Sequence, residues 1–547
     1  MIKYLTAIWK KRSKQLDWQL LLFLVLVLNV KLVIKLVALI LITVINYREI
    51  SVKTLFRRRY LWFYFGIIAV ALANIVLQYK LISLPYIIVA AMGILLWVLC
   101  ALASFHAFRI IQKGDPEKLF NTVGLFFMLH VGIIFFNFLL IVIETGSINP
   151  YTYKGLNQKY FVSTGDYIKG ITFDSPVTTA MICAFGVLFF LYRRRFLNSL
   201  LSFTALLIMA SSLTNFFLIC GLAFVFVFRS DRAQKSIMVV YGSMLLIFYI
   251  AVSPQNNEHV VSFVYKMIGK AYYLPKVKIL THADLKTAPD SILTFEQKRI
   301  KEGLLYMDSV NSVIDRDRNM VHPADTVALA LRTQSPKRKD TAFYEYKASE
   351  SVKEKENRFS LLLKDWYPYS QKDSLSKLYD WEEPGKWIAY KELAAYFTQH
   401  KNKIWLGAGI GNFSSRMAFK ATALDIAGSY PAKYQYIHPD FRDNYFYIYL
   451  YYHSQWQFKH TAANTPDSTY NQLAGEYGIA GLLLFFIFYC LYFIRRLRYL
   501  TYGLPLLFIM LMAFSVEYWF EQLSVVVLFE LLLFLDIRTS LGEERPR

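Results

Sequence analysis

Long apolar runs alternate with short basic segments over the first half of the chain and again near its end. A helix needs about 20 apolar residues to cross a bilayer unaided, so each run is a candidate membrane span. Several runs are shorter than this and would have to be tilted or extended at their ends. The runs lie near residues 60–79, 84–105, 120–143, 175–192, 197–212, 215–228, 236–253, 476–494, 502–517 and 522–536.

The first apolar run, residues 18–45, is too long for one comfortable span and too short for two. Asn29, Lys31 and Lys35 interrupt its middle, where a lysine that faced lipid would be costly. A tight hairpin of two short helices would keep the basic N-terminus on the cytoplasmic side, whereas a single helix would place it outside. We favour the hairpin, which gives about twelve transmembrane helices in an all-α polytopic integral membrane protein.

The composition supports this class, because 56% of the residues are hydrophobic and 17% aromatic. A net charge of +22 would suit a nucleic-acid-binding protein, but its distribution argues against that function. Six short connecting segments account for +18 of it, and basic loops of this kind mark the cytoplasmic side of a membrane protein. These segments are 1–16, 47–59, 106–119, 193–195, 229–235 and 495–499.

The same topology places one large loop on the opposite, extracytoplasmic side. We therefore expect an N-terminal transmembrane bundle (1–253), a loop domain (254–475), and C-terminal transmembrane helices with a cytoplasmic tail (476–547). Within the loop, residues 281–386 hold 18 basic and 18 acidic residues and few apolar runs. This balanced, polar composition is typical of a solvated helical insert or a partly disordered one.

The stretch "IWLGAGIGNFSSR", residues 404–416, raises the question of a phosphate site. Gly407, Gly409 and Gly411 provide the positive φ of a tight turn, and such loops can wrap a phosphate. The stretch lacks the lysine of a P-loop and does not fit G-x-G-x-x-G. It also lies outside the cytoplasm, where no ATP or NAD pool is present. A nucleotide site is thus disfavoured, while a membrane-anchored phosphate remains possible.

Three stretches resemble the O-antigen ligase and polysaccharide polymerase superfamily. "KGITFDSPVTTAMICAFGVLFF" (169–190) is similar to its G-x-F-x-x-P-N segment, and "LGAGIGNF" (406–413) to its G-x-G-x-G-N-F loop. "YNQLAGEYGIAGLLLFF" (470–486) resembles its segment that ends in E-x-G-x-x-G and continues into a span. The motif order and the large outer loop agree as well.

The resemblance implies a GT-C-like glycosyltransferase of the bacterial inner membrane, with its large loop in the periplasm. The implied donor is a glycan on undecaprenyl diphosphate, and the acceptor is a hydroxyl of a glycolipid or glycan chain. No metal and no cofactor are implied. Ligase and polymerase differ in the acceptor and not in the leaving group, so both readings stay open, and we lean slightly to a ligase.

A leaving diphosphate needs cationic groups that stabilise its charge. Arg416 follows the glycine loop by five residues and is the first candidate, with Arg442 and Lys403 behind it. Asn412 completes the loop motif. Glu476 matches the family pattern and would orient an arginine or stay hydrated at the membrane boundary. A solvated surface charge is the alternative reading for each cation.

The acceptor hydroxyl needs a general base within hydrogen-bond reach. The family's His-Asn pair, nine residues before the glutamate, is replaced here by Asp467 and Ser468. A histidine side chain ordinarily titrates near neutrality, so His460 competes with Asp467 for this role, and His438 follows them. A helix N-cap is the structural alternative for Asp467. The altered pair also leaves an inactive scaffold open, and a transporter of lipid-linked sugars is the rival from another class.

Overall fold

The chain divides into two compact units, one comprising Met1–Val261 and Glu354–Arg547 and the other Ser262–Lys353. The second unit contains only three of the described residues, so the architecture below is that of the first. The computed structural model describes residues 14–47, 52–77, 83–152, 168–209, 211–228, 230–253, 286–287, 301, 384–424, 428, 430–449 and 464–543.

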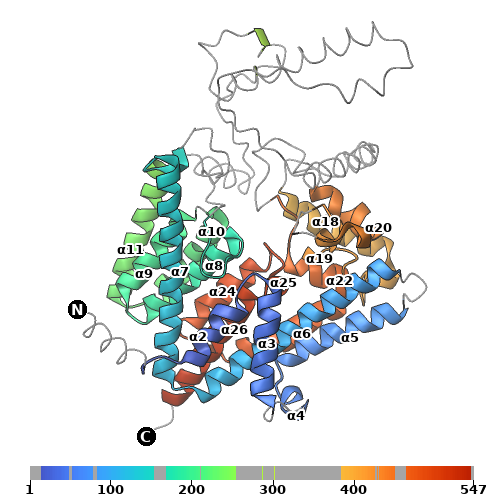
Figure 1. Cartoon of the computed structure of the whole chain (residues 1–547), viewed down its shortest axis with the longest axis horizontal. Helices are drawn as coiled ribbons and strands as arrows, with labels where there is room; N and C mark the ends of the chain where they lie inside the picture. The colour runs from blue at the N-terminus through green and yellow to red at the C-terminus, as the bar shows by residue number, and fades with distance from the viewer. Residues whose placement is uncertain are drawn as a thin grey trace. The chain divides into compact units, whose positions relative to one another are not determined.

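Over these residues the fold is all-helical and contains no strand, as the apolar runs predict (Figure 1). Four helical stretches are long and apolar enough to cross a bilayer, namely Leu84–Lys113, Pro116–Thr145, Arg232–Val252 and Thr469–Ile494. Shorter apolar helices accompany them, and the chain has the architecture of a helical membrane protein. The short apolar helices are α2 (Trp18–Val27), α3 (Leu32–Ile45), α5 (Leu61–Leu77), α8 (Pro176–Tyr192), α9 (Phe196–Ile208), α10 (Ser212–Phe228) and α24 (Gly503–Ala513).

The long helices begin and end at residues suited to those positions. Helix α6 (Leu84–Lys113) is capped by Ser83, whose side chain accepts from the Tyr86 N–H. Helix α7 (Pro116–Thr145) has Asp115 as its N-cap and Pro116 in the first turn, where the missing N–H costs nothing. It ends at Gly146, which adopts a left-handed conformation with φ of 63°.

The first apolar run forms the two short helices of the predicted hairpin, α2 and α3. Ten and 14 residues correspond to lengths of about 15 and 21 Å, which are less than the hydrocarbon thickness of a bilayer. The Val30 N–H, in the turn between them, donates to the Thr172 carbonyl at 2.8 Å. Lys35 is 4% exposed, so it faces the protein and avoids the cost of facing lipid.

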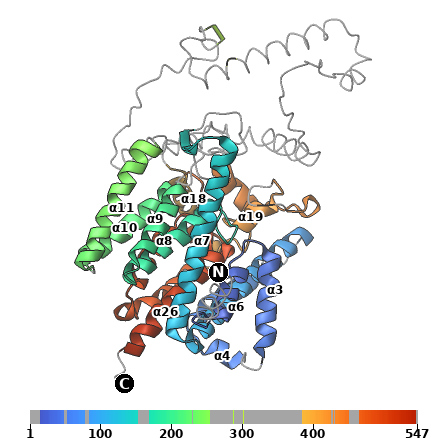
Figure 2. The same ribbon diagram turned by 60° about the vertical axis from the view of Figure 1, so that its left-hand side comes forward.

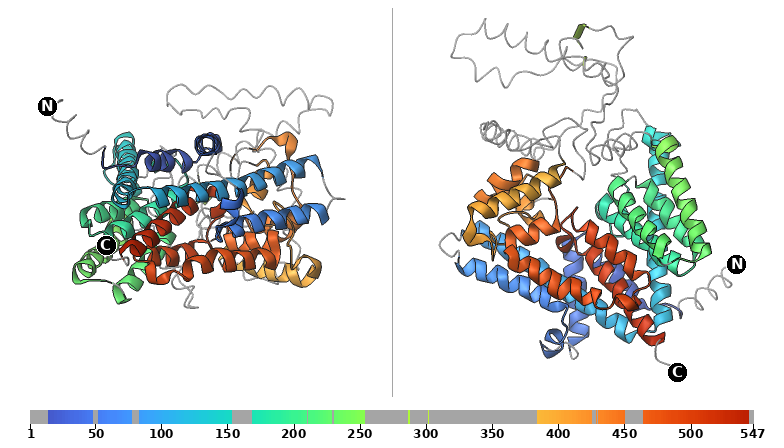
Figure 3. Two further views of the ribbon diagram at one scale, coloured as in Figure 1. Left: turned by 90° about the horizontal axis from the view of Figure 1, so that it is seen from below. Right: turned by 180° about the vertical axis from the view of Figure 1, so that it is seen from behind.

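Helix α26 (Ser524–Glu543) lies between two groups of helices (Figures 1 and 3). It packs against α6 on one side and against α7 and α8 on the other, while α5 and α22 (Thr469–Leu484) extend the first group. Helices α8, α9, α10 and α11 (Arg232–Ile247) form the second group beside α7 (Figure 2). The residues Val525–Phe534 are almost fully buried, so α26 is the central helix of the core.

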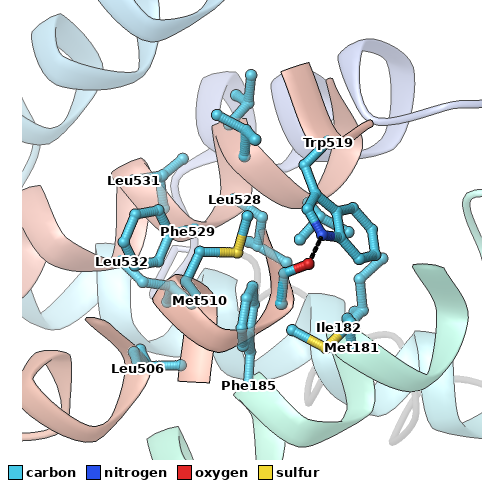
Figure 4. Packing of buried hydrophobic residues seen from close by; sticks show 14 of the residues in the cluster. Met181, Ile182, Phe185, Leu506, Met510, Trp519, Leu528, Phe529, Leu531 and Leu532 are labelled. Carbon is cyan, nitrogen blue, oxygen red and sulfur yellow. Dashed lines mark hydrogen bonds between the residues drawn. The ribbon is translucent and has the colours of Figure 1, made fainter. Parts of the chain in front are cut away.

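The packing around the start of α26 is tight and mostly apolar (Figure 4). Trp519, in the short helix α25 (Trp519–Gln522), is fully buried, and its indole N–H donates to the Ala513 carbonyl at 2.6 Å. At the other end, the Asp536 carboxylate accepts from the backbone N–H groups of Thr501 and Gly503 at 2.6 and 2.8 Å. These bonds tie the start of α24 to α26 and satisfy donors that a helix leaves free.

Candidate functional site

The glycine loop packs against a break in helix α22. Gly478 interrupts that helix with a φ of 65°, and the loop residues fill the break. The Ala408 and Gly409 N–H groups donate to the carbonyls of Gly475 and Glu476 at 2.8 and 3.0 Å. In return, the Ile479 N–H donates to the Ile404 carbonyl at 2.8 Å. Loop and helix therefore form one joint held by backbone hydrogen bonds.

All three loop glycines adopt positive φ, as predicted: 75° for Gly407, 96° for Gly409 and 72° for Gly411. The predicted binding of a phosphate by the backbone N–H groups of these glycines has less support. The Gly407 N–H donates to the Lys403 carbonyl at 2.7 Å and the Gly409 N–H to the Glu476 carbonyl, so neither is free for an anion. The glycines instead permit the close approach, because a Cβ on Gly407 would lie 2.4 Å from the Glu476 carbonyl carbon.

We expect Gly478→Ala to destabilise the folded protein by about 1–3 kcal/mol from its backbone conformation alone. The added Cβ would also lie 2.5 Å from the Trp405 carbonyl, so the joint would have to open. Thermal unfolding in detergent measures the change. The matched control is Gly132→Ala in α7, where no atom lies within 4 Å of the new Cβ. Equal melting temperatures for the two variants would contradict the packing role.

Asn412 and Glu476 lie on the inner side of the same joint. The Asn412 amide donates to the Ala408 carbonyl at 3.0 Å and accepts from the Tyr436 hydroxyl at 2.9 Å, which closes the turn. Glu476 is fully buried, and neither carboxylate oxygen has a hydrogen-bond partner. The polar groups that face its carboxylate are the Ser415 side chain and the backbone of Gly411 and Phe413. Glu476 is therefore enclosed by the glycine loop.

Arg416 begins helix α19 (Arg416–Ala421), which follows the glycine loop directly. Ser415 caps the helix by accepting from the Ala418 N–H at 3.0 Å. Lys420 lies one turn after Arg416, so the two cations share a helix face. Both side chains are half-buried, and neither makes a hydrogen bond or ion pair with another described residue. Two adjacent cations are thus held at the site without a protein counter-charge in direct contact.

Further charged side chains from distant parts of the chain surround this pair. We call Lys35, Asp174, Arg416, Lys420, Asp467 and Glu521 the charged centre. Lys35 interacts electrostatically with Asp174, Arg416 and Lys420, as well as with Cys100 outside the centre. Glu521 interacts with Arg416 and Lys420. Arg416 also acts on Asp467. The centre therefore brings together residues from α3, the segment before α8, α19 and α25, together with Asp467.

Hydrogen bonds hold Lys35, Asp174 and Glu521 of the charged centre in place. Lys35 Nζ donates to the Gln522 carbonyl at 2.9 Å, and the Gln522 side chain accepts from Thr178 Oγ1 at 2.6 Å. Ser524 Oγ donates to Asp174 Oδ2 at 2.8 Å. Glu521 accepts from the Gln472 amide. The acids and Lys35 are positioned in this way by neutral partners, and no direct ion pair between centre members occurs within the described residues.

Burial shifts the pKa values of Glu521 and Lys420 in the charged centre. It raises the pKa of Glu521 to about 7, although Lys420 and Arg416 oppose the shift. Burial also lowers the pKa of Lys420, and the nearby Arg416 adds to this. Near neutral pH Glu521 is consequently only partly ionised. The centre then has more positive than negative charge and is suited to an anion.

Asp467 lies directly before the N-cap of α22, and the cap is Ser468 rather than Asp467. Asp467 Oδ1 is buried without a hydrogen-bond partner. Lys386 donates to the Asp467 carbonyl at 2.6 Å and to the Val516 carbonyl at 2.9 Å. Burial raises the pKa of the Asp467 carboxyl and Glu517 adds to the rise, while Lys386 and Arg416 oppose it. A carboxylate with a raised pKa beside a free arginine is suited to general base catalysis.

Three other predicted residues lie apart from the charged centre. Lys403 forms an ion pair with Asp440, which also accepts from the Tyr396 hydroxyl at 2.7 Å. His438 Nδ1 accepts from the Asp440 N–H at 3.1 Å, so its ring is committed to this cluster. Arg442 pairs with the adjacent Asp443 at 2.7 Å on an exposed surface. The structure thus groups Lys403 and His438 around Asp440 and leaves Arg442 at the surface.

The remaining predictions concern His460 and metal ligands. His460 lies outside the described residues, as does almost all of the predicted polar insert 281–386. Across the described ranges no group of three or more His, Cys, Asp or Glu side chains is placed to hold a metal ion. The four cysteines, Cys100, Cys183, Cys220 and Cys490, are free, in agreement with their positions in apolar runs.

Four members of the charged centre were not among the predicted site residues: Lys35, Asp174, Lys420 and Glu521. Three of them carry a local signal. Lys35 interrupts an apolar run, and Lys420 follows Arg416 by four residues. Glu521 lies between two apolar runs. None of these signals indicates which charges meet. Comparisons of the chain with protein-family models, with curated proteins and with solved structures gave no match.

Proposed function

We propose that this protein is a membrane glycosyltransferase that moves a polyprenyl-diphosphate-linked saccharide onto a hydroxyl group. One observation carries the proposal: Arg416 and Lys420 lie together without protein counter-charges in contact, beside Lys35 and the Asp467 carboxylate. This arrangement combines an anion site with a candidate base. A glycosyl transfer from a diphosphate requires both.

Arg416 and Lys420 would bind the diphosphate oxygens and stabilise the charge that develops as the glycosidic C–O bond breaks. Each preorganised donor of this kind contributes about 2.7–4 kcal/mol to transition-state stabilisation in a site shielded from water. Lys35 would add long-range positive charge while its ammonium remains bonded to Gln522. The diphosphate leaves with the bonding electron pair, and no metal ion is needed for this charge balance.

Asp467 would accept the proton of the acceptor hydroxyl as its oxygen attacks the anomeric carbon. The unpartnered Oδ1 gives it a free lone pair for that proton. Lys386 holds the backbone on both sides, at Asp467 and Val516, and would keep the carboxylate in position. His460 is the alternative base.

The proposed setting is the bacterial inner membrane, with about twelve spans and the loop 254–475 in the periplasm. The basic connecting segments support this orientation through the positive-inside rule. It places the glycine loop, α19 and Asp467 on the side where lipid-linked glycans are used. The acceptor would be a glycolipid in an O-antigen ligase-like reaction, or a second glycan chain in a polymerase reaction.

Deletion of the gene tests the proposal through the surface polysaccharide, separated on a gel. Loss of a ligase should leave full-length glycan on its lipid carrier, and loss of a polymerase should leave acceptors with single repeats. Complementation with the wild-type gene should restore the pattern. A deletion strain with a normal glycan profile would contradict both forms of the proposal and leave the inactive scaffold.

A transporter of lipid-linked sugars is a second candidate, and one observation favours it. The turn between α2 and α3, the segment before α8 and helix α25 meet around Lys35, through the Val30–Thr172 and Lys35–Gln522 bonds. Broken helices whose ends meet at a buried charge are typical of transporters. In the same deletion strain, loss of a transporter would trap the lipid-linked donor in the cytoplasmic leaflet, whereas loss of a transferase would leave it in the outer leaflet.

A further inference from the structure

A second buried acid, Glu530 of α26, lies in the core and is not used by the proposed transfer reaction. It is fully buried, and Tyr64 of α5 donates to its Oε1 at 2.5 Å. Its other oxygen, Oε2, is buried, and the polar groups beside the carboxyl are hydroxyls only. No cation among the described residues pairs with it. An ionised carboxylate in this position would be uncompensated, and burial of such a charge is strongly unfavourable.

Two further hydroxyl groups lie beside the Glu530 carboxyl group. They are Ser104 Oγ of α6 and the Tyr489 hydroxyl, and both are buried with no polar partner other than the Glu530 carboxyl group. Each hydroxyl can accept a hydrogen bond as well as donate one. An acid proton on Oε2 would therefore find an acceptor in Ser104 or Tyr489, while Oε1 keeps the bond from Tyr64.

The other titratable groups near Glu530 do not replace that proton. They are Tyr60 before α5, Cys100 of α6 and Tyr492 of α23 (Leu491–Ile494), and none is cationic. Arg58 acts on Tyr60 and Tyr492 rather than on the carboxyl group. Cys100 donates to the Phe520 carbonyl at 3.0 Å. The elements packed around the acid thus provide hydroxyl and thiol groups only.

We propose that Glu530, with Tyr64, Ser104 and Tyr489, forms a proton-binding site inside the membrane bundle. The reaction is the binding of one proton by the carboxylate to give the neutral acid. Loss of the proton would leave an ionised carboxylate without a counter-charge between α5, α6 and α26. Because such a charge is costly to bury, proton loss would loosen the packing of these three helices. Helix α26 also carries Ser524, which bonds Asp174 of the charged centre. Proton release at Glu530 is thereby coupled to the packing of a helix that reaches the charged centre.

Infrared spectroscopy of the full-length protein in lipid nanodiscs tests the site directly. The wild type should show a carbonyl band of a protonated carboxyl group that Glu530→Gln lacks, and Glu144→Gln should keep it. Glu144 is exposed at the end of α7 and is the matched control. Identical wild-type and Glu530→Gln spectra in this region would show that Glu530 is ionised, and would overturn the proposal.

Hydrogen–deuterium exchange tests the coupling. After correction for the intrinsic pH dependence of exchange, wild-type α26 should exchange faster as the pH rises, because Glu530 loses its proton. Glu530→Gln imitates the protonated acid, so its exchange should stay slow and its melting temperature should stay close to that of the wild type. Glu530→Ala, which removes the partner of Tyr64, should melt lower. A Gln variant as unstable as the Ala variant would show that the charge itself is required and would overturn the site.

Neither measurement depends on glycosyl transfer. The proton site can therefore fail while the proposed function stands, and the reverse also holds.

Discussion

Replacing Arg416 with alanine is expected to lower the rate of glycosyl transfer by about 10²–10³-fold, the loss that follows removal of one preorganised donor to a developing anion. The guanidinium has no hydrogen bond or ion pair within the described residues, so its removal breaks no polar contact that holds the fold. Ser415 still caps α19 in the variant. The rate is measured with protein in nanodiscs, a polyprenyl-diphosphate-linked saccharide and a hydroxyl acceptor.

Two further variants, Arg416→Lys and Arg442→Ala, test the same assignment. Arg416→Lys keeps the charge but loses the fork of donors that fits a diphosphate, so it should retain an intermediate rate. Arg442→Ala is the matched control, because that side chain is 40% exposed and pairs with the adjacent Asp443. Exposed pairs of this kind contribute about 0–1 kcal/mol, so the control should transfer at nearly the wild-type rate. A fully active Arg416→Ala variant would remove the assignment of the anion site.

Much of the fold follows from the sequence, because an apolar run long enough to reach across a bilayer has few alternatives to a helix. The runs at 84–105 and 120–143 became the long helices α6 and α7, and the charged middle of 18–45 became the break between α2 and α3. The break at Gly478 was not predictable in this way. The sequence shows only a glycine in an apolar run, while the break depends on a loop some 70 residues earlier that packs into it.

The site was predictable only in part, for the same reason. The glycine loop and the altered His-Asn pair predict Arg416 and Asp467 as site residues, and both lie in the charged centre. Lys403 has an equally suitable charge, but the structure gives it Asp440 as a partner. Whether a cation is free or paired depends on which acid tertiary packing brings to it. Lys35 and Glu521 come from opposite ends of the chain and interact with the cations of α19, and no local sequence pattern predicts that proximity.

Asp467→Asn is expected to lower the transfer rate by about 10²–10⁴-fold, the usual contribution of a positioned general base. The amide keeps the shape of the side chain but cannot accept the proton. The base must be ionised to act, so the wild-type rate should rise with pH through the pKa of Asp467. Burial and Glu517 raise that pKa above the ordinary 3.8 of an aspartic acid, so the rise falls at higher pH than for an exposed carboxylate. A pH–rate profile measures it.

Lys386 provides the decisive second variant, because its ammonium opposes the rise in the Asp467 pKa. Lys386→Met removes that charge and keeps most of the side-chain length, so the acidic limb of the profile should move to higher pH while activity returns at alkaline pH. A merely structural lysine would lower the rate at every pH without moving the limb. His460→Ala distinguishes the competing base. If that variant is inactive while Asp467→Asn retains the wild-type profile, the proton goes to the histidine, and Asp467 has only a positioning role at the start of α22.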